Sequence, residues 1–256
     1  MSAFEILCVT MHQTDFSKLK QMNIHSDVVF ANQADRTAFD EAEFEGHRAR
    51  MITTATRGVG VNRNTALLYA EGDICLFADD DMVYCDGYAQ TIAGAFEEHP
   101  DADVIVFNLI EPEKTRYVIP KVAKVSYLNF LRYGTARMAI RTAVVRKHGI
   151  CFNQCFGGGT EHCHGEDNLF LADCLKKGLK VYAVPVFLAE LTEERQSSWN
   201  TGYGEKYLKD QGVLYRTMSR KYWRLLCLQD VLRHRNKYGM SWLEAYKLMV
   251  AGAKTV

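Results

Sequence analysis

The chain has 256 residues, of which 48% are hydrophobic and 24% are charged, as in an ordinary globular protein. Its formal net charge is zero, and we expect no nucleic acid partner. The amino-terminal stretch MSAFEILCVT has no basic region and predicts no secretory signal, and no window approaches the roughly 18 apolar residues that cross a bilayer. The eight scattered cysteines are therefore expected as reduced thiols in a cytoplasmic protein.

The first half of the chain alternates between short apolar runs and helical patterns. Helices are predicted at 58–72 and 86–100, the second with Asp86 as its N-cap. Strands that alternate with helices predict an α/β fold with a mostly parallel central sheet and helices on both faces. The predicted strands are 4–10, 26–31, 50–55, 73–78 and 103–109.

The second half is less regular. Extended pieces are predicted around a short helix at 126–133, and further on a helix at 165–178 precedes a strand at 180–188. Residues 216–256 include nine Lys or Arg and two Asp or Glu, so nine minus two gives this segment a charge of +7. We therefore expect an α/β domain at 1–215, followed by a basic amphipathic helical extension.

Three consecutive acids, Asp79, Asp80 and Asp81, follow the apolar run LFA at the end of the fourth predicted strand. Ligands of open α/β sheets bind outside the carboxyl ends of the strands. Mg²⁺ and Mn²⁺ commonly take one or two carboxylates together with phosphate oxygens of a substrate. A solvated acidic turn is the alternative, but the position at a strand end favours a metal–phosphate site.

Two histidines and three cysteines form a second group of potential metal ligands, at Cys151, Cys155, His162, Cys163 and His164. Their spacing lacks the C-x₂-C pairs of common structural zinc sites. The sequence therefore disfavours zinc at this position.

Two stretches resemble inverting family 2 glycosyltransferases. GVGVNRNTALLYAEGDICLFADDDM is similar to the family's G-x-x-x-x-R-N helix and the strand after it, which ends in Asp-x-Asp. GEDNLFLADCLKKGLKVYAVP is similar to the family's Glu-Asp motif on the acceptor side, with its following helix and strand. The resemblance covers residues 4–190 and implies a single nucleotide-diphospho-sugar-binding domain with the GT-A fold.

The resemblance implies a donor site at the acids. Asp79 and Asp81 would be the Asp-x-Asp pair that holds Mn²⁺ or Mg²⁺, with Asp81 as the more direct ligand. Relatives carry a DDGS-like turn after the second strand, where this chain reads ANQAD. For Arg57 and Arg63, ordinary surface positions are the alternative to a contact with the nucleotide. The nucleotide-sugar contacts expected by position are Thr10, Asn32, Gln33, Asp35, Arg57, Arg63 and Asp80.

The Glu-Asp motif implies the acid–base chemistry. Inversion requires a base that deprotonates the acceptor hydroxyl, and the departing nucleoside diphosphate requires charge stabilisation. Asp167 is the expected base, and Glu166 is expected to bind the acceptor or orient its loop, although an acidic first helical turn would also be favoured by the helix dipole. Acceptor contacts are expected at Gly158, Gly159, His164 and Trp199, with a flexible turn and a core tryptophan as the alternatives.

The resemblance implies a metal-dependent inverting hexosyltransferase in cell-surface polysaccharide synthesis. The expected donor is a UDP-sugar, and the expected acceptor is a saccharide or a lipid-diphosphate-saccharide. A non-catalytic nucleotide- or sugar-binding protein of the same fold is the alternative, while a nucleotidyltransferase would require a glycine-rich basic loop where this chain reads VTMHQTDF.

The basic extension contains Trp223 and Trp242 among its cations, a composition that predicts contact with an anionic membrane surface. The protein would then lie peripherally on the inner face of the membrane. Packing of the extension on the domain, with its leucines covering the sheet, is the alternative.

Overall fold

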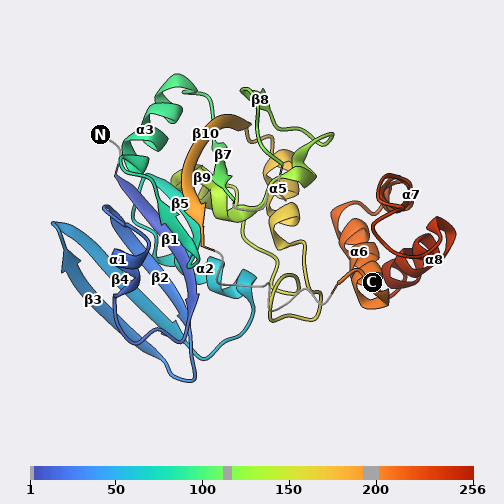
Figure 1. The fold of residues 1–256 in the computed structure, drawn as a ribbon, viewed down its shortest axis with the longest axis horizontal. Helices are drawn as coiled ribbons and strands as arrows, with labels where there is room; N and C mark the ends of the chain where they lie inside the picture. Colours follow the sequence, from blue (N-terminus) through green and yellow to red (C-terminus); the bar gives the residue numbers. More distant parts are fainter. Residues whose placement is uncertain (1–2, 112–116, 193–201) are drawn as a thin grey trace.

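The computed structural model describes residues 3–111, 117–192 and 202–256. Its centre is a 10-stranded sheet in the order β3-β4-β2-β1-β5-β9-β7-β10-β6, with β8 paired to β10 (Figure 1). The strands are β1 Phe4–Met11, β2 Asp27–Gln33, β3 Ala38–Phe44, β4 His47–Thr54, β5 Ile74–Asp79, β6 Met82–Tyr84, β7 Val104–Ile110, β8 Ala123–Lys124, β9 Met138–Arg141 and β10 Val181–Leu191. The α-helices are α1 Lys18–Gln21, α2 Val59–Tyr69, α3 Tyr88–Glu98, α4 Thr142–Lys147, α5 Glu166–Lys176, α6 Glu205–Met218, α7 Trp223–Arg233 and α8 Trp242–Ala253. Two 3₁₀ turns, η1 Phe130–Arg132 and η2 Thr135–Arg137, precede β9.

The sheet is mostly parallel, which confirms the predicted α/β class. Strands β4, β2, β1, β5, β7 and β10 share one direction, and β9 runs against its two neighbours β5 and β7. The sequence did not predict β3, which forms a hairpin with β4 around Glu45 and Gly46, both at positive φ. This edge strand is largely exposed and polar, so it lacks the apolar run that marked the other strands.

Alternate residues of the central strands enter two separate hydrophobic clusters. Leu7 and Phe77 point to the face that carries α2, α4 and α5, whereas Ile6 and Leu76 point to the face covered by α1 and α3. This is the two-residue period of strands that are buried on both sides. Helices therefore cover both faces, as the alternating pattern predicted.

Helix α3 begins differently from the prediction. Its N-cap is Gly87, in the left-handed region with φ of 73°, and no side chain caps the helix. Asp86 instead accepts a hydrogen bond from Asn23 Nδ2 at 3.0 Å. The prediction of Asp86 as the N-cap was wrong because the chain turns through a glycine before the helix starts.

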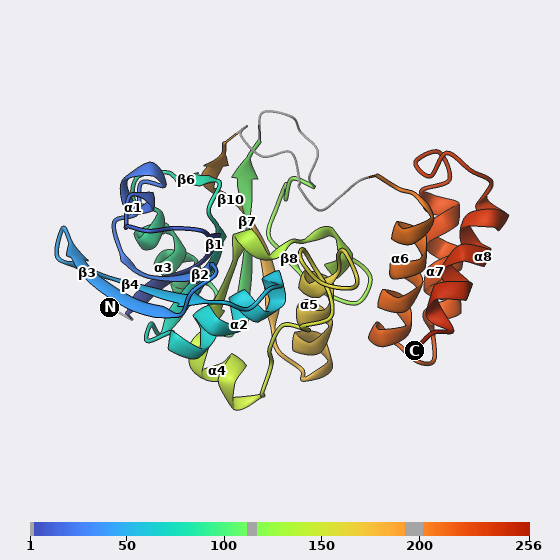
Figure 2. The same ribbon diagram turned by 90° about the horizontal axis from the view of Figure 1, so that it is seen from below.

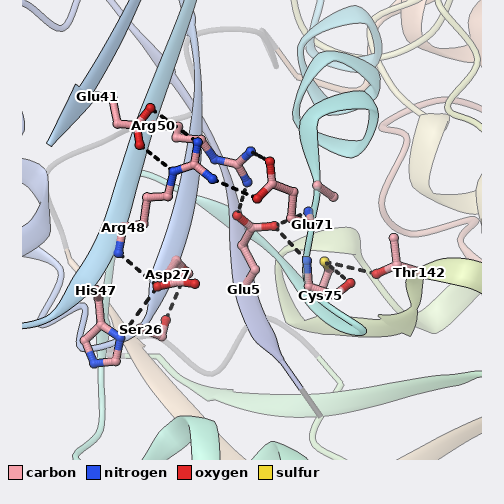
Figure 3. Close-up of polar contacts among 12 residues, drawn as sticks. Glu5, Ser26, Asp27, Glu41, His47, Arg48, Arg50, Glu71, Cys75 and Thr142 are labelled. Atoms are coloured by element: carbon pink, nitrogen blue, oxygen red, sulfur yellow. Dashed lines mark hydrogen bonds and ion pairs between the residues drawn. The ribbon is translucent and has the colours of Figure 1, made fainter. Parts of the chain in front are cut away.

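At the amino ends of the strands, a buried ion cluster joins β1, β4 and the loop after α2 (Figure 3). We call Glu5, Arg50 and Glu71 the amino-end cluster. The Arg50 guanidinium pairs with Glu5 and lies 2.5 Å from Glu71 Oε1, and both Glu5 and Arg50 are almost completely buried. Glu5 Oε2 also accepts the backbone N–H groups of Glu71 (2.7 Å) and Gly72 (3.1 Å), so two backbone donors compensate the loss of hydration of this carboxylate.

Helices α6, α7 and α8 pack together at one end of the molecule (Figures 1 and 2). Glycines let α6 and α8 approach closely: a Cβ on Gly212 would lie 1.8 Å from the carbonyl oxygen of Met249. The expected domain boundary after residue 215 falls inside α6, which begins at Glu205. The division into two units therefore stays a prediction, and the helical unit starts ten residues before residue 215.

Trp223 is 5% exposed and belongs to the core of this helical unit, whereas Trp242 is 46% exposed. Leu225 and Leu232 are more than half exposed, whereas Leu226 and Leu228 are partly buried and pack against the hydrophobic cluster that includes Leu7 and Phe77. Across the three described ranges, no helix combines the length and the apolar character needed to cross a bilayer.

Candidate active site

The two motifs meet at the carboxyl ends of the strands. Arg63 of α2 donates from Nη2 to Asp79 Oδ1 at 3.0 Å and from Nη1 to Glu166 Oε1 at 2.7 Å. Asp79 is the last residue of β5 and Glu166 is the first of α5. We call Arg63, Asp79, Glu166 and the neighbouring Asp167 the carboxyl-end cluster.

The loop before α5 is shaped to reach this cluster. Gly157 has φ of +98°, and a Cβ there would lie 2.4 Å from Val59 Cγ1 and 2.7 Å from Glu166 Oε2. Gly158 accepts the backbone N–H of Val59 through its carbonyl oxygen at 2.9 Å. A side chain at residue 157 would therefore separate the start of α2 from the Glu166 carboxylate.

Arg63 stays charged in this buried position. Burial lowers the pKa of its guanidinium, but the charges of Asp79 and Glu166 outweigh that effect and the net result is a raised pKa. The guanidinium is therefore a permanent link between the end of β5 and the start of α5.

Asp167 has an unusual carboxyl group. Burial, followed by the charge of Glu166, raises its pKa from 3.8 to about 7, although Arg63 and the N–H of Asn168, which donates to Oδ1 at 2.7 Å, act in the opposite direction. A carboxyl group with a pKa near neutrality can accept a proton and release it again at physiological pH. Asp167 therefore has the properties of a general base.

Asp167 lines a cavity of about 760 Å³, open to solvent, between the loop that carries η1 and η2 and the helices α6 and α7. His164 lies in the same cavity; its Nε2 is 2.6 Å from Gln211 Oε1, and its ring stacks on Tyr207 at 4.3 Å between centroids. The expected base and one expected acceptor residue thus share a space of the size that small-molecule sites occupy.

The other expected acceptor residues lie elsewhere. Gly158 and Gly159 lie beside the start of α2 and do not line the cavity, and Trp199 falls outside the described residues. Of the group tested for zinc, His162 Nδ1 lies 3.1 Å from Asp210 Oδ1 of α6, and Cys163 Sγ lies 3.1 Å from His164 Nδ1. His162 therefore connects the loop before α5 to α6, whereas the contact between Cys163 and His164 lies within that loop.

The acidic triplet divides into different environments. Thr10 Oγ1 donates to Asp80 Oδ2 at 2.5 Å, and Lys18 Nζ donates to the backbone oxygen of Asp80 at 2.9 Å. Thr10 and Asp80 therefore join the ends of β1 and β5. The Asp81 carbonyl accepts both the N–H (2.9 Å) and the hydroxyl (3.1 Å) of Thr192, just beyond β10.

The donor set at the end of β5 suits a metal that shares its ligands with a phosphate. Within the described residues, no group of three or more His, Cys, Asp or Glu side chains could hold a metal by itself. Mg²⁺ and Mn²⁺ sites that use substrate phosphates require only one or two carboxylates. Asp79 and Asp81 fit that smaller requirement.

The expected nucleotide contacts after β2 have mainly structural partners. Asn32 is fully buried and donates to Gln13 O and Thr53 Oγ1, each at 3.0 Å. Gln33 donates to Gly58 O at 3.1 Å, and Asp35 pairs with Arg57 at the surface. Their roles toward a nucleotide stay predictions.

Sequence reasoning missed two residues beneath the site. Lys18 lies on the one-turn helix α1, which is distant from both motifs in the sequence although it contacts Asp80 in space. No sequence signal connected the two residues. Asn62, next to Arg63 in the motif, donates to Thr10 O at 3.2 Å and Ala31 O at 2.8 Å, and so ties α2 to the ends of β1 and β2.

Comparison with known families agrees with this geometry. A sequence model described as "Glycosyl transferase family 2" matches residues 19–152, just over half of the chain, including Arg63 and the three acids. The chain belongs to glycosyltransferase family 2. The matched segment ends before α5, so the assignment of Asp167 depends on the geometry described above.

Solved structures share the fold of this family 2 glycosyltransferase. S. aureus TarS residues 1–349 in complex with UDP-GlcNAc superpose with a TM-score of 0.63 at 17% sequence identity, covering 97% of this chain and 76% of that one. Another S. aureus TarS structure gives a TM-score of 0.62 at 17% identity and covers 97% of this chain, which spans 46% of that TarS chain. At this identity the likeness shows the GT-A fold alone. The search of curated proteins gave no match.

Proposed function

We propose that this glycosyltransferase is a metal-dependent inverting enzyme that transfers a hexose from a UDP-sugar to a hydroxyl of a saccharide acceptor. One observation carries the proposal: Asp167, with a pKa raised to about 7, lies in a cavity and is joined through Glu166 and Arg63 to Asp79 at the strand end. In this proposal, the base and an acid on the donor side belong to one hydrogen-bonded cluster.

In this mechanism the acceptor hydroxyl lies in the cavity and gives its proton to an Asp167 carboxylate oxygen as it attacks the anomeric carbon. Arg63 fixes Glu166 and thereby the first turn of α5, on which Asp167 lies. Asp79 and Asp81 would hold Mn²⁺ or Mg²⁺, which supplies charge stabilisation for the departing UDP.

The donor proposal is supported by the TarS structures, which contain UDP and UDP-GlcNAc on the same fold. A lipid-diphosphate-linked saccharide in cell-surface polysaccharide synthesis is the proposed acceptor. Asp167 favours turnover over binding alone, because carboxyl groups with strongly shifted pKa values in cavities cluster at functional sites.

Release of UDP from UDP-GlcNAc and other UDP-sugars, measured with Mn²⁺ and after chelation, tests the proposal. Asp167→Asn keeps the shape of the side chain and removes its basicity, so we expect UDP binding to persist while turnover falls by at least roughly 10²-fold. The matched control is Asp173→Asn, an exposed acid on the same helix that pairs with Lys176.

Three outcomes would contradict the proposal: turnover that survives Asp167→Asn, equal loss in the Asp173→Asn control, or a product that retains the anomeric configuration of the donor. UDP-sugar binding without any turnover in the wild type would favour the non-catalytic alternative.

We further propose that the helical unit touches an anionic membrane surface. Support comes from Arg220, Lys221 and Arg224, which are exposed near the exposed side chain of Leu225; the buried Trp223 cannot contribute its ring. Each basic residue near such a surface adds about 1 kcal/mol. Sedimentation should show binding to anionic vesicles that weakens with salt, whereas equal partition to neutral vesicles would contradict it.

A further inference from the structure

The cavity beside Asp167 has two walls that come from distant parts of the chain. The first wall belongs to the α/β core and includes Arg132 at the end of η1. The second wall belongs to the carboxyl-terminal helices and includes Tyr207 of α6, Arg233 of α7 and Lys237 in the following turn. The basic extension therefore contributes side chains to the cavity that contains Asp167.

The helical wall is fixed relative to the expected base. Asp210 of α6 accepts the backbone N–H of Cys163 at 3.0 Å. A Cβ on Gly165 would lie 2.6 Å from Leu214 Cδ2, so the residue before α5 touches α6 directly. These contacts lie within four residues of Asp167, and they set the distance between the base and the helical wall.

The acid on this wall already has its own donors. Asp230 Oδ1 lies 2.5 Å from His234 Nδ1, and Asp230 Oδ2 accepts the hydroxyl of Tyr238 at 2.8 Å. Burial raises the pKa of Tyr238, which keeps this hydroxyl protonated as a donor. The negative charge of Asp230 is thus engaged inside the wall.

Three of the cations that line the cavity, Arg132, Arg233 and Lys237, differ from Asp230 in this respect. In the described part of the chain, none of Arg132, Arg233 and Lys237 has a carboxylate oxygen within 4.0 Å. Arg132 lies over the Tyr117 ring at 5.0 Å and Lys237 over the Tyr203 ring at 4.2 Å, so aromatic faces hold two of these cations.

We propose that this cavity recognises a saccharide acceptor that carries a negatively charged group, bound by Arg132, Arg233 and Lys237 while a hydroxyl of the acceptor reaches Asp167. The inference depends on the proposed transfer reaction, because it assigns the acceptor side of the same site. Guanidinium groups form bidentate hydrogen bonds with phosphate and carboxylate groups. The tyrosine rings of the cavity provide flat apolar faces against which a sugar ring can pack. A phosphate ester and a uronic acid share this chemistry.

The test measures binding without turnover. Ligand-observed NMR in the presence of UDP would compare glucose, glucose 6-phosphate and glucuronate as probes. We expect both anions to bind about tenfold more tightly than glucose, as charge-assisted hydrogen bonds would produce, and the stronger of the two identifies the group. In the Arg233→Gln/Lys237→Gln double variant this preference should disappear.

Arg220→Gln/Lys221→Gln is the matched control, since it removes the same charge from the turn between α6 and α7, outside the cavity lining. Arg132→Gln provides a second test on the core wall, should the helical variant melt at a lower temperature. Equal binding of glucose and the anions, an unchanged preference in both cavity variants, or an equal loss in the control would each overturn the inference. Since UDP release from the donor is measured separately, failure of the transfer reaction would be recognised independently.

Discussion

Two buried arginines, Arg50 and Arg63, lie at opposite ends of the same sheet, and each holds two carboxylates. In the amino-end cluster, Arg50 lies between Glu5 and Glu71. In the carboxyl-end cluster, Arg63 lies between Asp79 and Glu166. The residue types are nearly the same, yet the surroundings give the two clusters different capacities.

The amino-end cluster has a buried centre, the Glu5–Arg50 pair, whereas its outer acid Glu71 is 61% exposed. The Glu5 side chain is 3% exposed and accepts two backbone N–H groups in addition to Arg50. These bonds connect β1, β4 and the loop after α2, and none of the three side chains lines the cavity beside Asp167. Such a network can stabilise one arrangement of the strands, and its buried carboxylate, Glu5, is already engaged by Arg50 and two backbone N–H groups.

The carboxyl-end cluster is open. The Asp79 side chain is 37% exposed, and Asp167, beside Glu166, faces the cavity with a pKa raised to about 7. Here the single positive charge of Arg63 lies near three carboxyl groups, those of Asp79, Glu166 and Asp167. The comparison shows that a buried arginine pair becomes chemically useful where parallel strands end and loops leave space for a substrate.

Substitution of the two arginines by methionine should give the largest difference. Arg50→Met leaves Glu5 buried without its cation, so the free energy of unfolding should fall by about 3–5 kcal/mol, with the turnover of folded protein unchanged. Arg63→Met should cost less stability, about 1–3 kcal/mol, because Asp79 is partly hydrated, but it should lower turnover at least tenfold, by our estimate from the lost link. Urea unfolding measures the stability of each variant and UDP release measures its turnover. Equal losses of turnover in Arg50→Met and Arg63→Met would contradict the difference between the two clusters.

Substitutions of acids at the two ends of the sheet, Asp81 and Glu5, should also differ in whether they affect turnover or stability. Asp81→Ala should reduce turnover by about 10²–10³-fold, because a divalent metal supplies several kcal/mol of charge stabilisation, with little change in melting temperature. Glu5→Gln should lower the melting temperature and keep the metal-dependent rate. An Asp81→Ala enzyme that keeps its rate in chelator-treated buffer would show that the triplet holds no metal.

The smallest expected effect is a shift in pH dependence. The turnover of the wild type should rise with pH through about 7, as Asp167 loses its proton. Glu166→Gln removes the neighbouring charge, so the pKa of Asp167 should fall and the acidic limb should move to lower pH by roughly 0.5–1 unit. Glu71→Gln, in the amino-end cluster, should leave the limb in place, and an equal shift in both variants would contradict the assignment.

The same titration affects stability with a definite sign. The pKa of Asp167 is higher in the folded protein than the ordinary aspartate value of 3.8, so the folded state binds more protons between pH 4 and 7. Its contribution to stability therefore declines as pH rises through this window. Asp167→Asn should remove that decline and make the folded protein more stable than the wild type at pH 8, as thermal unfolding at pH 5 and pH 8 would show.

Local pattern predicted much of the site. The run LFA followed by three acids marked the end of β5, and the Glu-Asp pair marked the start of α5, because buried strands and acidic first turns leave strong sequence signals. The exposed strand β3 and the cap of α3 left weak signals, and both were missed. Lys18 was missed because its contact with Asp80 spans 62 residues of chain.

The sequence by itself determined the fold class and the identity of the acids, since apolar periodicity and motif spacing are local properties. Only the tertiary structure decided that Arg63 pairs with Glu166, 103 residues further along the chain, as well as with Asp79, and that burial raises the pKa of Asp167. The tertiary structure also turned the basic extension into a wall of the cavity, with Trp223 buried in its own helical core. All three features depend on how helices and strands pack against one another. Packing brings together residues that are distant in the chain, and their spacing in the sequence carries no signal of that contact.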